Sequence, residues 1–315
     1  MPVRKRQAAS SVVPPDSALA SDPAARGLAD DAAVLPLGDE RLILTKDMMV
    51  EGVHWFGADA AVPSDPADVA WKLLSVNLSD LAAKGAAPLG VLLGFTLGDA
   101  DWDHRFAEGL GAALAVYDVP LLGGDTVSAS GARTLSLTAL GRATCYPVPG
   151  RDGAEAGDGL WLCGAVGDAY AGYSLSQNGT EIGDAALLSA FHRPRALLME
   201  GRALAPHVHA MMDVSDGLLL DAARMARASG LSVAIDGDAV PRSAAFQSWA
   251  GDDPSRWAQA IRFGDDYALL FAAPPGFAPP VPATCIGCFL DDARSHLILD
   301  GAPLSMYDHG GWLHN

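Results

Sequence analysis

The clearest pattern of hydrophobic and polar positions lies between Ala70 and Pro88, where the chain reads AWKLLSVNLSDLAAKGAAP. Leu, Val and Ala recur there at the three- and four-residue spacing of a helix that is buried over most of its surface. Asn77, Ser79 and Asp80 interrupt the apolar pattern. A carboxylate in such a helix needs a partner, because burying an unpaired charge is costly. The pattern therefore predicts a buried helix whose middle turn meets a polar or charged partner.

Capping signals set the ends of this helix. Asp65 is a good N-cap and Pro66 a good first helical residue, whereas Gly85 and Pro88 stop the helix, so we expect it over residues 66–84. Buried or alternating apolar runs predict strands, which we place at residues 32–37, 41–45, 90–97, 120–122, 133–141, 160–165, 210–214, 231–235, 267–272 and 296–299. Further helices are expected at residues 102–117, 183–191, 194–204 and from about 216 onwards.

Composition changes along the chain in a way that indicates two domains. Residues 1–26 are rich in Ala, Ser and Pro and predict a flexible N-terminal tail. Residues 151–159 are rich in Gly and charge, so we place the boundary just before them, with an N-terminal domain at 27–147 and a C-terminal domain at 148–315. Strands and helices alternate irregularly, which favours an α+β fold over a uniformly parallel α/β sheet.

The 315 residues carry a formal net charge of −17, which argues against nucleic-acid binding. A polyanionic ligand would also be repelled unless metal ions or local Arg and Lys side chains intervene. Four cysteines are too few for a disulfide scaffold in a chain of this length, so we expect a reduced, cytoplasmic location. No apolar run reaches the roughly 18 to 20 residues of a membrane span, so we expect no membrane partner.

Asp residues recur at the ends of predicted strands, at helix starts and inside the predicted buried helix. They lie in the segments ADDA (29–32), TKD (45–47), NLSD (77–80), GGDT (123–126) and DVSDG (213–217). The sequence contains no P-loop and no dinucleotide fingerprint, so a phosphate site here would rest on metal ions. Hard Mg²⁺ is held by a few carboxylates together with phosphate oxygens. We therefore expect several Asp side chains to converge on cations that hold phosphates.

Each of these residues has a simpler explanation when it is taken alone. Asp30 and Asp216 fit turn or N-cap positions, where Asp is favoured. Asp80 and Lys84 stand four residues apart on a helix and would form an ion pair. His54 fits an ordinary core histidine. The metal hypothesis therefore depends on several of these side chains meeting in space.

Jointly, the motifs resemble one family. The chain contains, in this order, GLADDAAVL, LTKDMMVEGVHW, NLSDLAAKGAAP, LLGGDT, RDGAEAGD, MMDVSDGLLLD, FGDDYALL and a terminal YDH. From Gly27 to its C-terminus it resembles the thiamine-monophosphate kinases, which belong with aminoimidazole ribonucleotide synthetase. The resemblance implies that two-domain fold: an α/β N-terminal domain whose sheets form a dimeric barrel, followed by an α+β C-terminal domain.

The resemblance also implies an activity. It is the direct in-line transfer of the ATP γ-phosphoryl group to thiamine monophosphate with several Mg²⁺ ions, in a cleft near the interface of a homodimer. The acceptor is a phosphate monoester with a second pKa of about 6, so it is ionised at neutral pH and needs no strong general base. The protein then has to position the substrates and neutralise charge, and we expect no phosphoenzyme intermediate.

The motifs carry the family's functional residues onto numbered positions of this chain. The expected metal ligands are Asp30, Asp31, Thr45, Lys46, Asp47, Asp80, Asp125, Asp213 and Asp216. The residues expected at ATP are Gly124, Asp125, Arg151 and Ser215. The residues expected at thiamine monophosphate are His54, Asp265, Tyr307 and Trp312. Of these, the residues expected to be catalytic are Asp80, Asp125 and Arg151.

Some positions depart from the family pattern. Ala29 replaces a Gly, Lys84 a Met and Asp265 a Glu. Lys46 stands where the family tends to have a hydroxyl residue at a metal site, so we expect its ammonium to substitute for one Mg²⁺ or to lower that ion's occupancy. Two alternatives stay open: another enzyme of the same superfamily, and a nucleotide- or thiamine-phosphate-binding protein without activity.

Overall fold

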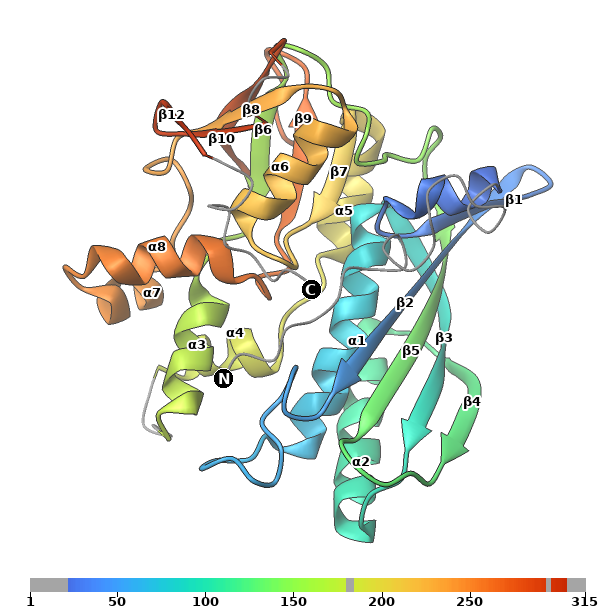
Figure 1. Cartoon of the computed structure of the whole chain (residues 1–315). Coiled ribbons are helices and arrows are strands. Elements are labelled where there is room, and N and C mark those ends of the chain that lie inside the picture. Colours follow the sequence, from blue (N-terminus) through green and yellow to red (C-terminus); the bar gives the residue numbers. More distant parts are fainter. Residues whose placement is uncertain (1–21, 180–183, 293–295, 305–315) are drawn as a thin grey trace.

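The computed structural model of the chain describes residues 22–179, 184–292 and 296–304, and it is built on two β-sheets (Figure 1). The N-terminal sheet has the strand order β1-β2-β5-β3-β4, with β1 (Ala33–Leu37), β2 (Glu40–Val50), β3 (Ala86–Thr96), β4 (Leu121–Val127) and β5 (Thr134–Ala143). The C-terminal sheet has the order β12-β11-β8-β10-β6-β9-β7, with β6 (Gly159–Cys163), β7 (Ala210–Asp213), β8 (Ser232–Ile235), β9 (Leu269–Ala273), β10 (Thr284–Leu290), β11 (Leu297–Leu299) and β12 (Ala302–Pro303).

Helices cover these sheets and connect them (Figure 1). They are η3 (Pro23–Leu28), α1 (Pro66–Ala83), α2 (Ala100–Tyr117), α3 (Asp168–Gln177), α4 (Ala185–His192), α5 (Leu198–Leu204), η4 (Ala205–His207), α6 (Leu218–Ala228), α7 (Ala244–Ala250) and α8 (Pro254–Phe263). Within the described part of the chain, no helix combines the length and the apolar character needed to cross a lipid bilayer.

Helix α1 lies between the two halves of the molecule, which explains its nearly continuous apolar surface. It packs on β2 and β5 on one side and on α5 and β7 on the other. Asp65 caps it as predicted, because its carboxylate accepts a hydrogen bond of 2.9 Å from the Ala67 amide. Asn77 and Ser79 are fully buried. A helix that is packed on two sides has no solvent face where such polar residues can point, so they must bond within the interior.

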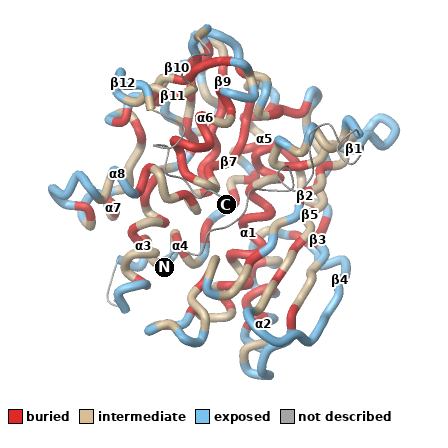
Figure 2. The backbone as a smooth tube through the Cα atoms, viewed as in Figure 1, coloured by how far each residue is buried: buried red, intermediate tan, exposed pale blue. Residues whose placement is uncertain are grey.

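The N-terminal sheet presents only one of its faces to the core. Along β2, Ile43, Thr45 and Met49 are buried on the helix side, whereas Lys46 and Met48 are exposed on the other. The outer face and the edge strand β4 also expose large apolar side chains, among them Leu92, Leu121, Leu122 and Val127. Figure 2 shows the contrast between buried α1 and exposed β4. An apolar sheet face of this kind is typical of an interaction surface.

Strand β7 of the C-terminal sheet lies at the centre of the molecule, where it packs on α1. All four residues of β7 are buried, and the strand ends at Asp213, directly before the loop that leads into α6. Of the strand pairs in this sheet, β11 and β8 are parallel and the others are antiparallel. Mixed pairing with helices packed at the sides agrees with the predicted α+β class.

Several predicted elements differ from the structure. Residues 23–26 were expected in a flexible tail but belong to η3, whereas residues 1–21 lie outside the described part of the chain. The helix predicted at 194–204 begins only at Leu198, because Pro194 and the segment after it run as a loop. Helices α3, α7 and α8 were not predicted. The expected domain boundary at residue 147/148 falls in the connection between β5 and β6.

Candidate active site

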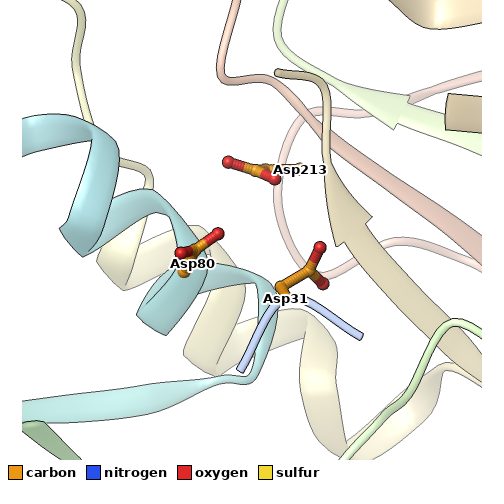
Figure 3. Close-up of side chains that lie close together, drawn as sticks. All are labelled: Asp31, Asp80 and Asp213. Carbon is orange, nitrogen blue, oxygen red and sulfur yellow. The ribbon is translucent and has the colours of Figure 1, made fainter. Parts of the chain in front are cut away.

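Three carboxylates from distant parts of the chain meet between the two sheets. Asp31 precedes β1, Asp80 lies in the last turns of α1, and Asp213 ends β7. One ligand oxygen from each lies within 4.8 Å of the others (Figure 3). We call these three residues the carboxylate cluster. Figure 3 shows the three side chains directed toward a common space.

Burial and mutual repulsion disfavour the ionised form of the carboxylates in this cluster. Burial raises the pKa of Asp80 well above its ordinary value, and the nearby carboxylates of Asp47, Asp213 and Asp31 raise it further. Burial, together with Asp31, raises the pKa of Asp213 to about 8. Such carboxylates are stable as anions only when cations compensate their charge.

The hydrogen bonds around the cluster orient the carboxylates without neutralising them. Ser79 Oγ donates to Asp213 Oδ2 over 2.6 Å, and Thr45 Oγ1 donates to Asp80. Asp213 Oδ1 is buried and has no hydrogen-bond partner among the described residues. Since buried polar atoms are nearly always satisfied, an orphaned oxygen in a cluster of three carboxylates fits a bound hard cation. The donor set, all oxygen, suits Mg²⁺.

Two cations lie on the other side of the cluster. Arg151 bonds Asp31 Oδ1 through Nε at 2.8 Å and again through its Nη2, and its side chain keeps some solvent access. Lys84 Nζ lies 2.5 Å from Asp30 Oδ1 and 2.6 Å from Asp31 Oδ2. The alternative explanation of Asp80 by an i, i+4 ion pair with Lys84 is therefore wrong, because the ion pairs of Lys84 in the described structure are with Asp30 and Asp31.

Asp30 is separate from the carboxylate cluster. Its oxygens contact Lys84 and Arg26, each at 2.5 Å. Burial alone would raise its pKa, but the two cations together lower it to about 2. Arg26 also donates to the carbonyl oxygens of Val148 and Pro149 over 2.9 and 3.2 Å, so it ties η3 to the connection between the sheets.

Strand β2 brings two of its three predicted ligands toward the cluster and turns the third away. Thr45 donates a hydrogen bond to Asp80, and the negative charge of Asp47 helps to raise the pKa of Asp80. Lys46 stands between them in sequence and points to the opposite face, where its Nζ lies 3.3 Å from Ser136 Oγ. Within one subunit Lys46 therefore faces away from the carboxylate cluster, because successive side chains of a strand alternate between its faces, and its part in a metal site stays a prediction.

The predicted nucleotide residues on β4 lie far from the cluster within one subunit. Strands β5 and β3 separate β4 from β2, which puts them roughly 14 Å apart at three interstrand spacings. Asp125 pairs with Gly94, which pairs with Ser136 on the exposed face, so Asp125 lies on that face too. Gly124 is required by packing, because a Cβ there would lie 2.0 Å from the Leu93 carbonyl oxygen.

The loop after Asp213 is held by a buried carboxylate that sequence reasoning missed. Asp221 accepts hydrogen bonds from the backbone amides of Ser215 and Asp216 at 3.1 and 3.0 Å. Arg224 bridges Asp221 and Asp216, at 2.9 and 2.5 Å. Asp216 is therefore not in the carboxylate cluster but ion-paired beside it. The i, i+3 spacing of Asp221 and Arg224 was the available signal.

The predicted substrate residue Asp265 is bound to α1 through Lys72, about two turns before Asp80 on the same helix. Asp265 adopts a left-handed conformation with φ 60° and accepts from Lys72 Nζ at 2.7 Å and from the Tyr267 hydroxyl at 3.0 Å. Lys72 is buried, with its ammonium 3.9 Å from the centre of the Phe191 ring, and was not predicted as a site residue. His54 is half-buried, and its Nδ1 accepts from the Val50 amide at 2.9 Å. Predicted Tyr307 and Trp312 lie outside the described residues.

Known proteins and solved structures match this chain over about nine-tenths of its length. The chain is 37% identical over 310 residues to the thiamine-monophosphate kinase of Caulobacter vibrioides, covering 93% of this chain and 86% of that protein. It is 36% identical over 306 residues to the thiamine-monophosphate kinase of Salmonella typhimurium, covering 90% and 91%. It resembles the solved structure of AaThiL complexed with AMPPCP and TMP with a TM-score of 0.82, at 30% identity and 91% coverage of each chain.

The two halves of the chain also match family descriptions separately. Residues 29–143 match the AIR synthase related protein N-terminal domain, and residues 155–277 match the corresponding C-terminal domain. The fold and the site therefore define a two-domain protein of the AIR synthase class, as predicted. Identity to the curated relatives over nine-tenths of the chain narrows this class: the chain belongs to the thiamine-monophosphate kinase family.

Proposed function

We propose that the carboxylate cluster is where this chain, an ATP-dependent kinase of thiamine monophosphate, transfers the γ-phosphoryl group to make thiamine diphosphate. The observation that carries the assignment of the site is the convergence of Asp31, Asp80 and Asp213 with an orphaned carboxylate oxygen among them. Phosphoryl transfer between two polyanions requires such a place for cations. The reaction belongs to thiamine biosynthesis.

The cluster and two neighbours, Thr45 and Asp47, are proposed to hold Mg²⁺. Bound Mg²⁺ would neutralise phosphate charge and orient the donor and acceptor oxygens. Thr45 keeps the Asp80 carboxylate oriented, and Ser79 does the same for Asp213. Asp30 and Asp216, which are ion-paired beside the cluster, are proposed to act through their neighbours and to tune its charge.

Arg151 is proposed to contact the ATP phosphates. Its guanidinium now pairs with Asp31, yet its side chain retains 18% of its solvent exposure, so it can exchange a carboxylate for a phosphate. Ser215, in the loop beside Asp213, is proposed to line the nucleotide. Because the acceptor phosphate is ionised at neutral pH, we assign no residue as general base. Direct transfer requires no phosphoenzyme.

The substrate side is proposed to include His54 and Asp265. Asp265 carries a carboxylate suited to the positive charge of the thiazolium ring, and Lys72 fixes its orientation. Tyr307 and Trp312 remain candidates for the aromatic cover of the thiamine. A reduced cytoplasmic location is proposed as well, and the four free cysteines, two of them exposed, support it.

We further propose that the exposed face of the N-terminal sheet forms the dimeric barrel with a second copy. Its apolar side chains, which include Leu92 at 41% and Met48 at 52% exposure, support such an interface. Asp125 and Gly124 lie on the same sheet but roughly three strand spacings from β2. Because Asp125 lies far from the carboxylate cluster of its own subunit, we propose that it acts at the nucleotide of the partner subunit.

Subunit mixing tests the role of Asp125. When Asp80→Asn and Asp125→Asn chains are co-expressed, hybrid dimers contain one intact site if Asp125 serves its partner. A random mixture should then recover about a quarter of wild-type activity, since half the dimers are hybrids with one site each. Absence of any recovery would show that both residues act within one subunit.

Release of ADP tests the overall function. With ATP, Mg²⁺ and thiamine monophosphate, the protein should release ADP in step with thiamine diphosphate. Thiamine, which lacks the acceptor phosphate, is the matched control and should give no ADP above background. Stable labelling of the protein by γ-labelled ATP would contradict direct transfer.

A further inference from the structure

Lys84 brings a positive charge into the interior beside the carboxylate cluster. It is the C-cap residue of α1, and its side chain has no solvent exposure. Its Nζ lies 2.5 Å from Asp30 Oδ1, 2.6 Å from Asp31 Oδ2 and 3.1 Å from the Met211 carbonyl oxygen. Three oxygens, two from the adjacent Asp30 and Asp31 and one from β7, thus surround one ammonium.

The two cations at Asp31 differ in how firmly they are held. Arg151 is partly exposed and pairs with Asp31 Oδ1. Lys84 is enclosed on all sides and holds Asp31 Oδ2 together with a second carboxylate. Removing Lys84 would leave the buried Asp30 with Arg26 alone and Asp31 with Arg151 alone, which is more costly than exchanging an exposed partner.

We infer that Lys84 is a built-in cation that occupies the place of a divalent ion between Asp30 and Asp31. Asp31 then offers only Oδ1 to a metal, after Arg151 moves to a phosphate. The carboxylate cluster together with Asp30 consequently binds one divalent ion fewer than these carboxylates would hold without Lys84. Lys84 is a positioning residue: it touches no substrate and fixes the charge and orientation of Asp31. Within one subunit, the role that we had expected for Lys46 falls to Lys84. This inference rests on the proposed metal role of the carboxylate cluster.

The test counts ions directly. Full-length wild type and Lys84→Met, which keeps an unbranched side chain of similar length without charge, are saturated with Mn²⁺ and AMPPCP and compared by native mass spectrometry. We expect Lys84→Met to bind one more Mn²⁺ per subunit. Without metal, its melting temperature should drop below that of wild type, and Mn²⁺ should restore it.

The control is Arg105→Met, which removes an equal charge from the exposed Arg105–Asp65 pair. It should leave the ion count unchanged. An equal count in wild type and Lys84→Met overturns the inference, and so does a Lys84→Met protein that no Mn²⁺ concentration allows to fold. Wild type that binds no Mn²⁺ at all would instead refute the proposed metal site.

A second measurement does not depend on any variant. Anomalous scattering from crystals of wild type with Mn²⁺ and AMPPCP should show no ion in contact with Asp30. The Lys84 ammonium should remain between Asp30 and Asp31. A manganese peak bonded to both aspartates, with Lys84 displaced, would overturn the inference.

Discussion

At Asp80, burial and neighbouring charge act in the same direction. The side chain lies in the packed interface between α1 and β2, and Asp47, Asp213 and Asp31 all disfavour its ionised form. A carboxylate in this position lowers the stability of the metal-free protein. We propose that this carboxylate serves to bind a cation. Removing its charge should therefore lower activity while leaving stability equal or higher.

Replacing Asp80 with Asn should abolish most activity without unfolding the protein. The amide keeps the shape and can still accept from Thr45, but it cannot bind a cation as an anion. We expect kcat/KM to fall at least about 10²- to 10³-fold. The free energy of unfolding in EDTA should be equal or higher.

The measurements are ADP release and urea unfolding. Asp101→Asn, in the exposed first turn of α2, is the matched control and should behave as wild type. Near-normal turnover of Asp80→Asn would refute the central role of the cluster.

His192 should contribute to the pH dependence of stability. Burial lowers its pKa, Lys72 and Arg193 lower it further, and Asp68 opposes them. The neutral ring is therefore favoured in the folded state. Its contribution to stability is complete above its ordinary pKa of about 6.5 and is lost as the pH falls through the lowered folded-state value.

We accordingly expect His192→Gln to flatten the dependence of the unfolding free energy on pH below about 6.5. Urea unfolding across this range measures it. His104→Gln, on the exposed surface of α2, is the control. A His192→Gln protein with the wild-type pH profile would show that burial of this ring has no energetic consequence.

At the scale of single residues, sequence patterns identified which residues belong to the site better than they identified the partner of each residue. Asp31, Asp80 and Asp213 were predicted to converge, and the structure brings them together. Lys84 was paired with Asp80 by helix spacing, yet its position at the helix C-cap lets the side chain reach Asp30 and Asp31 instead. Spacing along one element cannot reveal a partner from another.

At the scale of elements, close contact between α1 and α2 depends on a glycine. A Cβ at Gly109 would lie 2.3 Å from the Ala67 Cα. At Gly111, two residues further along the same helix, no atom of the described residues lies within 4 Å of such a Cβ. The same substitution at these two positions should therefore have opposite effects.

Gly109→Ala should destabilise the protein by about 1–3 kcal/mol, because the helices must separate. Gly111→Ala should stabilise it by about 0.5–1 kcal/mol, because Ala has the higher helix propensity. Urea unfolding of both variants gives the two free energies. Equal effects would mean that α1 and α2 are not in the contact described.

Element predictions succeeded where the deciding signals are local. The boundaries of α1 followed from Asp65, Pro66 and Gly85, which act within one turn. Helices α7 and α8 are short, and each buries only two side chains, so their apolar periodicity was too sparse to identify. The face of Lys46 followed from strand alternation once Thr45 was placed inward, which is information that the sequence contained and that we had not used.

At the scale of the whole molecule, the exposed face of the N-terminal sheet should decide the oligomeric state. Leu92→Glu places a charge in the middle of that face. If the face forms the proposed barrel, burying this charge would prevent association, and light scattering after size exclusion should report a monomer. Val116→Glu, at a residue of α2 that is 66% exposed, should remain dimeric. A dimeric Leu92→Glu protein would place the interface elsewhere.

The two-domain architecture was predictable from motif order, whereas the meeting of the domains was not. Nothing along the sequence shows that α1 packs on both sheets, or that Arg26 reaches the carbonyls of Val148 and Pro149. These are contacts of tertiary structure, and those of Arg26 join segments more than a hundred residues apart. They determine which of the predicted residues share a site.

The hydrogen bond between Ser79 and Asp213 spans 134 residues of chain. A ribosome that makes the protein from its N-terminus therefore releases Asp31 and Asp80 long before Asp213 is synthesised. Loop closure over such a distance is slow and comes late in folding. The centre is complete only after β7 has docked on α1, so nascent chains that stop short of β7 are inert, and the appearance of activity reports that both halves have folded.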